Sequence, residues 1–280
     1  MSLGRDTIIS LGSKLPPALG IFGRLRALLD DADTDLDAIV ELVRVDPALT
    51  FQVIRLSNSA LYGMRSRCLA LEDAVARIGF GEIHQLVGLV VSRQTFQGDL
   101  RLYDIQASRL WENAVALGTL ASSFAKRASS DPGSAYSTGL LRNLGKIILN
   151  NFPGAVHYPG PALQPDVFAW ELATHGMAAP EATAILLDHW SFAPGVAGAV
   201  CLHREAERGS EFALGAAQLH LACGVAVDWG CALPGESTGW RRDLQICAQA
   251  GLTEEDFTGA IEEARQLFDR FAKVEWGQTA

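Results

Sequence analysis

The sequence has little clustered positive charge. Its 280 residues include 23 Lys and Arg against 32 Asp and Glu, which gives a net charge of −9. No basic run is longer than a pair such as Arg241–Arg242. Proteins that bind nucleic acid neutralise phosphates with clustered Lys and Arg. The composition therefore argues against nucleic acid as a partner.

Several signatures of catalysis, secretion and membrane insertion are also missing. None of the five cysteines forms a C-x-x-C pair, so we expect buried, reduced thiols in a cytoplasmic protein. Neither the G-x-G-x-x-G nor the G-x-x-x-x-G-K-[ST] phosphate loop occurs. Arg5 and Asp6 interrupt any signal peptide. The longest apolar zone, residues 216–234, contains His220 and Asp228, which favours a buried helix over a membrane span.

No stretch alternates apolar and polar residues with period two, the pattern of a half-buried strand. Apolar residues recur instead at three and four positions, and 49% of all residues are hydrophobic. We therefore predict an all-α multi-helix bundle. The loop at 157–165 contains three prolines. Helices are expected at 19–29, 35–43, 47–63, 71–77, 83–96, 103–128, 136–151, 167–175, 179–190, 196–203, 212–231, 241–250 and 254–274.

The stretch from Asp46 to Gly63 is the most clearly marked of these helices. Asp46 can accept an orphan backbone N–H as the N-cap, and Pro47 suits the first helical position. Leu49, Val53, Leu56 and Ala60 form one apolar stripe, and Gly63 ends the run. The stretch holds no paired acid and base and no metal-ligand cluster, so we interpret it as architecture.

Three motifs occur in a specific order: Leu15–Pro17, the Asn58–Ser59–Ala60 end of the Asp-Pro helix, and the turn from Ala74 to Gly79. In this order they resemble the HDOD family, bacterial signalling domains related to HD phosphohydrolases. The resemblance implies an HD-like core preceded by an N-terminal helical subdomain. It divides the chain into a lead-in at 1–12, an HDOD domain at 13–210 and a C-terminal helical extension at 211–280 packed on it.

The resemblance also indicates where a metal would bind. HD phosphohydrolases use one or two metals to polarise phosphate and to lower the pKa of a bound water. Their adjacent His-Asp pair corresponds here to Arg142 and Asn143, within Gly139–Lys146, and further ligand positions fall at Asn113, Ala179 and His203. Arginine cannot ligate a cation, and one imidazole is too few for a catalytic metal. We expect a degenerate metal site, no cofactor and no enzymatic activity.

Three functions remain open from the sequence. The first is a non-catalytic signal-transduction module that works through protein–protein contact with a signalling partner supplied in trans. Asn58 and Ser59 are its candidate partner contacts, although both also suit a hydrogen-bonded helix terminus. The sequence specifies no oligomeric state.

The other two functions use the interior. A small-ligand sensor would bind an anion in the former metal cavity, lined by Asn113, Arg142, Asn143 and His203, with Arg142 pairing the anion bidentately. A phosphohydrolase with a rearranged metal site would use Asp188, His189 and His203.

Three further polar side chains are interpreted as structural. We expect Lys146 to be a solvated charge, His84 a partly exposed helix residue and His220 a hydrogen-bonded core histidine.

Overall fold

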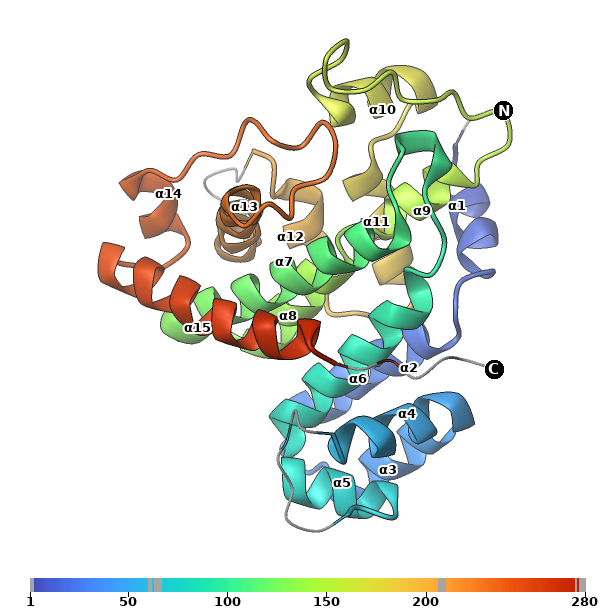
Figure 1. The fold of residues 1–280 in the computed structure, drawn as a ribbon, viewed down its shortest axis with the longest axis vertical. Coiled ribbons are helices and arrows are strands. Elements are labelled where there is room, and N and C mark those ends of the chain that lie inside the picture. The colour runs from blue at the N-terminus through green and yellow to red at the C-terminus, as the bar shows by residue number, and fades with distance from the viewer. Residues whose placement is uncertain (1–2, 60–61, 63–66, 206–209, 275, 277–280) are drawn as a thin grey trace.

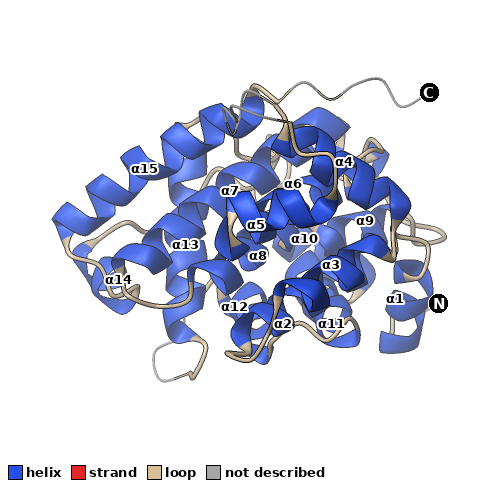
Figure 2. Ribbon diagram, turned by 90° about the horizontal axis from the view of Figure 1, so that it is seen from below, coloured by secondary structure: helices blue, strands red, loops and turns tan. Residues whose placement is uncertain are grey.

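The computed structural model describes residues 3–59, 62, 67–205, 210–274 and 276. Within these ranges the chain is helical without a strand, apart from one isolated antiparallel bridge between Leu100 and Ile105 (Figure 2). The prediction of an all-α multi-helix fold is confirmed for these residues. In chain order the elements are α1 (Arg5–Gly12), α2 (Ala18–Asp30), α3 (Leu36–Arg44), α4 (Pro47–Ser57), α5 (Leu71–Ile78), α6 (Phe80–Thr95), η1 (Arg101–Tyr103), α7 (Ala107–Arg127), α8 (Pro132–Leu141), α9 (Leu144–Asn150), α10 (Val167–His175), α11 (Ala179–His189), α12 (Pro194–Leu202), α13 (Ala213–Asp228), α14 (Leu244–Gln249) and α15 (Glu254–Ala272).

Helices α2 to α5 form an N-terminal subdomain below the main bundle in Figure 1, joined to it through α6. As predicted, Asp46 caps α4 by accepting the N–H groups of Ala48 and Leu49, at 2.9 and 3.0 Å. The helix ends at Ser57, well before Gly63, and the Asn58 side chain caps this end by donating to the carbonyl of Ile54 at 2.8 Å. Ala60 and Gly63 lie outside the described residues.

The main bundle is built around α7, which packs against α8, α13 and α15 (Figure 1). The helix predicted at 103–128 begins later, because the chain turns at Asp104 with a positive φ of 54°. Residues 101–103 form η1 instead, and α7 starts at Ala107. Two long C-terminal helices, α13 and α15, cover the central helix α7. None of the described helices combines the length and apolar character needed to cross a bilayer.

The helix predicted at 136–151 is two helices. Asp131 caps α8 by accepting the N–H of Gly133 at 2.9 Å, and α8 ends at Leu141, before Arg142 and Asn143. Helix α9 then packs closely on α11, since a Cβ on Gly145 would lie 1.9 Å from the carbonyl oxygen of Ala179. The apolar pattern did not reveal the break because buried residues continue from the end of α8 through Arg142 and Asn143 into α9. The break separates Arg142 and Asn143 from the regular helix on either side.

All five cysteines are free, and four of them are buried as predicted. Cys201 differs from the prediction and is exposed, because it lies on a face of α12 that α8, α11 and α13 leave uncovered.

His84 also differs from the prediction, because it is buried rather than partly exposed. Its helix, α6, is covered by α2 on one side and by α8 on another. The imidazole stacks on Phe22 at 4.7 Å, and its Nε2 lies 3.4 Å from the Ser137 hydroxyl. Burial and the positive charge of Arg26 lower the pKa of His84 to about 3. The imidazole is therefore neutral in the folded protein at neutral pH.

This burial predicts a pH effect on stability. The unfolded chain takes up a proton on His84 below its ordinary pKa of 6.5, whereas the folded chain does so only near pH 3. Stability therefore falls as the pH falls between these values, by up to about 1.4 kcal/mol per pH unit from this residue. A His84→Gln variant should show a shallower decline in the free energy of unfolding, measured by urea denaturation from pH 7 to pH 4. His157→Gln, on the surface, should keep the wild-type slope; an unchanged slope in His84→Gln would contradict the assignment.

Candidate functional site

The four residues expected to line the former metal cavity meet in the centre of the bundle. Asn113 projects from α7, Arg142 and Asn143 from the α8–α9 break, and His203 from the end of α12. Arg142 Nε donates to His203 Nε2 at 2.9 Å, and Asn143 Nδ2 donates to Asn113 Oδ1 at 2.7 Å. All four side chains are buried. The structure brings them into one hydrogen-bonded group, and a binding role for this group stays a prediction.

His203 is held as a neutral ring. Its Nδ1 lies 2.7 Å from the carbonyl oxygen of Val200, so Nδ1 carries the proton and Nε2 accepts from Arg142. Burial and the charge of Arg142 lower the pKa of His203 well below its ordinary value. The ring also stacks on Trp240 at 5.7 Å. His203 therefore supports the Arg142 side chain.

Lys146 lies in the same interior, which corrects the prediction of a solvated charge. Its side chain is only 1% exposed, and Nζ lies 2.9 Å from Glu171 Oε1 and 3.0 Å from Glu236 Oε1. The prediction was wrong because it assumed one helix through this region. The separate helix α9 is instead buried from Leu144 to Leu149.

Arg142 and Lys146 share a counter-ion. Arg142 Nη2 lies 2.8 Å from Glu236 Oε2, so the carboxylate of Glu236 bridges the two cations. Glu171, on α10, binds Lys146 and also accepts from the Tyr103 hydroxyl at 3.0 Å. We call Arg142, Lys146, Glu171 and Glu236 the buried charge cluster. Two positive and two negative side chains make it neutral overall.

The pKa values of the cluster follow from this pairing. Burial acts to lower the pKa of Lys146, but the negative charges of Glu171 and Glu236 outweigh it and raise that pKa. Burial acts to raise the pKa of Glu236, but the positive charges of Arg142 and Lys146 outweigh it and lower that pKa. The two cations therefore keep Glu236 ionised, and the two carboxylates keep Lys146 protonated.

Neither acidic member of the cluster is among the residues predicted from the sequence. Glu171 had a usable signal, because it is the only charged residue in the otherwise apolar run of α10, VFAWELATH, before His175. Glu236 had none, because it lies in a loop rich in glycine and proline. That loop also contains the G-x-S-x-G spacing at Gly235–Gly239, but no strand precedes it as a nucleophile elbow requires, and Ser237 is exposed.

The loop between α13 and α14, residues 229–243, is held over the former metal cavity by hydrogen bonds from several elements. Asn113 Nδ2 donates to the carbonyl of Cys231 at 2.8 Å, and Arg109 Nη2 donates to that of Ala232 at 2.9 Å. The backbone N–H of Arg241 donates to His220 Nε2 at 2.8 Å, which confirms His220 as a hydrogen-bonded core histidine. This loop, from the C-terminal part of the chain, thus covers the site.

The donor set does not fit an HD-type metal centre. Of the positions that the resemblance assigns to metal ligands, one holds Arg142, a permanent cation, and another holds Ala179, which has no donor side chain. Among the described residues no group of three or more His, Cys, Asp and Glu could hold a metal ion.

The alternative metal site at Asp188, His189 and His203 is not supported either. Asp188 is exposed and paired with Arg5, and His189 is also exposed, whereas His203 is fully buried. The structure does not bring these three together.

The two candidate partner contacts lie in the N-terminal subdomain. Asn58 Nδ2 donates to the carbonyls of Ile54 and Cys68, both at 2.8 Å, and Asn58 Oδ1 accepts the N–H of Cys68 at 2.7 Å. Ser59 Oγ donates to the carbonyl of Leu56 at 2.6 Å. Asn58 therefore ties together chain segments ten residues apart, and a partner contact stays a prediction.

The buried charge cluster predicts a large difference between two identical substitutions. Lys146→Met removes the ammonium that Glu171 and Glu236 share, leaving buried carboxylates short of a partner, which should cost about 3–5 kcal/mol of unfolding free energy. Lys126→Met removes an exposed ammonium 3.7 Å from Glu263 and should cost less than about 1 kcal/mol. Urea denaturation at pH 7 measures both. Equal losses would contradict the cluster.

Comparison with known proteins finds a relative that is similar in sequence. An uncharacterized protein of Treponema pallidum (strain Nichols) is 30% identical over 148 residues, a match that covers 52% of this chain and 27% of that protein. The chain therefore spans about a quarter of the length of that relative.

Solved structures under 25% identical share the fold. An HDOD domain protein of unknown function from Geobacter sulfurreducens is 19% identical with a TM-score of 0.71, covering 96% of this chain and 99% of that one. A candidate signal transduction protein from Marinobacter aquaeolei VT8 is 20% identical with a TM-score of 0.70, covering 96% and 64%. A candidate phosphohydrolase from Shewanella amazonensis SB2B is 23% identical with a TM-score of 0.69, covering 95% of each chain. The model of the HDOD domain family matches residues 15–206, most of the chain, and this protein therefore belongs to the HDOD domain family.

Proposed function

We propose that this HDOD protein is a non-catalytic, cytoplasmic signal-transduction module that acts through contacts with a signalling protein. One observation carries the proposal: the positions of the His-Asp pair hold Arg142 and Asn143, and Arg142 is paired internally with Glu236. A metal-dependent hydrolase needs several protein ligands and an open coordination position for water. The interior offers cations and carboxylates that pair with one another instead.

The catalytic part of the proposal is tested with the purified chain. We expect no hydrolysis of bis(p-nitrophenyl) phosphate with Mn²⁺, Mg²⁺ or Fe²⁺ above the rate of an Arg142→Gln variant, and no stoichiometric metal by elemental analysis. The proposal would be overturned if the wild type showed metal-dependent hydrolysis and Asn143→Ala abolished it. That loss would locate the activity in the former metal cavity.

The N-terminal subdomain supports the contact part of the proposal. It exposes large apolar side chains, with Leu69 83%, Val45 67% and Phe51 64% accessible to solvent. Single exposed apolar residues are normal, but several on one small unit favour a surface that a partner covers. Asn58 lies in the same subdomain, but Asn58→Ala would also release Cys68 and is a poor probe of contact.

A pair of matched variants tests this surface. A tagged chain used as bait in extracts of its native host should retain a signalling protein, and Leu69→Ser should reduce that retention about tenfold or more, the effect of losing about 1.4 kcal/mol of binding energy. Leu163→Ser changes a residue of equal size that is 77% exposed in the loop before α10, and should retain the partner like the wild type. Equal retention by both variants would contradict a contact through this subdomain.

A further inference from the structure

Glu236 reaches the buried charge cluster from outside the segment that matches the family, which ends at residue 206. Without it, the cluster would hold two cations, Arg142 and Lys146, and one anion, Glu171. The remaining positive charge would be buried, since both cationic side chains are no more than 2% exposed. A buried charge without a counter-ion is strongly destabilising. The interior therefore requires one more anion at this position.

The Glu236 carboxylate supplies this anion and contacts both cations, as a bound anionic ligand would. Its Oε2 lies 2.8 Å from Arg142 Nη2 and its Oε1 lies 3.0 Å from Lys146 Nζ, so each oxygen faces a different cation. Its backbone carbonyl accepts from Trp240 Nε1 at 2.6 Å. Gly235, with φ of 75°, allows the turn that directs Glu236 inward, and it has no room for a Cβ beside Tyr158.

We propose that Arg142 and Lys146 form a binding site for a small oxyanion, and that Glu236 of the α13–α14 loop occupies this site as an internal carboxylate ligand. The C-terminal helices then have a defined role, because they deliver the anion that the interior lacks. The other two nitrogens of the Arg142 guanidinium are engaged by His203 and Asn143, at 2.9 and 3.1 Å. An external anion could therefore bind only in place of Glu236.

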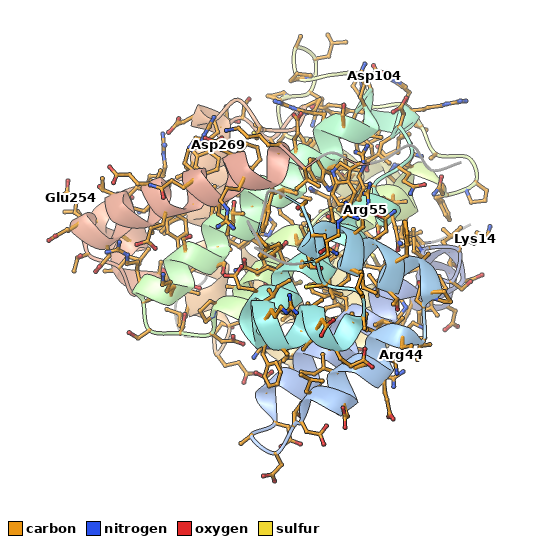
Figure 3. All side chains as sticks on the ribbon, turned by 60° about the horizontal axis from the view of Figure 1, so that its bottom comes forward. Lys14, Arg44, Arg55, Asp104, Glu254 and Asp269 are labelled. Carbon is orange, nitrogen blue, oxygen red and sulfur yellow. The ribbon has the colours of Figure 1, made fainter. Side chains whose placement is uncertain are left out.

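A surface cavity lies beside the loop, next to the cluster. Its volume is about 620 Å³, and it is lined by Tyr103, Arg109, Tyr158 and residues 232–235 and 237. Tyr103 both lines this cavity and donates to Glu171 in the cluster. Asp104, labelled in Figure 3, marks the cavity on the outside of the molecule. Removing the Glu236 side chain should open space between the cavity and the two cations.

Rescue by added anions tests the proposal. Glu236→Ala should lower the melting temperature by about 10 °C at pH 7, since a buried pair is broken. Sodium formate should restore at least half of that loss, saturably, compared with sodium chloride at equal ionic strength. The wild type should show no formate-specific effect. Neither should Glu263→Ala, which removes a carboxylate from a surface pair with Arg127.

Two further variants keep the test decisive. Glu236→Gln fills the space with a neutral side chain and should be destabilised without rescue by formate. Lys146→Met combined with Glu236→Ala removes half of the site and should also lose the rescue. If Glu236→Ala does not fold alone, the refolded yield with formate against chloride becomes the measurement.

The proposal fails if Glu236→Ala melts like the wild type, if formate acts no better than chloride, or if rescue persists in the double variant. The assay has no catalytic readout and involves no partner. Its outcome is therefore independent of the proposed function.

Discussion

The buried cations Arg142 and Lys146 impose the strongest constraint on this molecule. Removing a charge from water costs several kcal/mol, and the protein recovers that energy only if a counter-ion is held at contact distance. Glu171 and Glu236 supply the counter-ions, one from α10 and one from the α13–α14 loop. The α8–α9 break, α10 and the C-terminal segment must therefore assemble together, because each leaves an unpaired buried charge in the absence of the others.

The break between α8 and α9 allows Arg142 and Lys146 to face the same interior. Gly145 lets α9 approach the start of α11 more closely than any side chain would allow. The hydroxyl of Thr183, on α11, accepts the N–H of Gly145 at 2.8 Å and lies 2.9 Å from the carbonyl oxygen of Arg142. Backbone groups left over by the interrupted helix thus find partners on α11. Arg142 and Lys146 can then both face the interior, although they lie on either side of the interruption.

The protein has the fold of the HDOD family, and its interior is filled by paired charges of its own chain. In a metal enzyme, imidazoles and carboxylates surround an external cation and leave a position open for water. Here the cations belong to the chain, and the loop that carries Glu236 closes the space above them. This internal pairing is the basis of our proposal that the protein acts through contacts with other proteins.

The sequence by itself determined the all-α fold, most helix positions, the cap at Asp46, and the family. These properties depend on local periodicity, on single capping side chains and on motifs read in order. The sequence also indicated that Asn113, Arg142, Asn143 and His203 share one interior. Only the tertiary structure decided that α8 and α9 are separate helices, that His84 and Lys146 are buried, and that Glu171 and Glu236 pair with the cations. Periodicity reports which face of a helix is apolar, whereas the partner of a buried charge depends on which distant segments fold against that face.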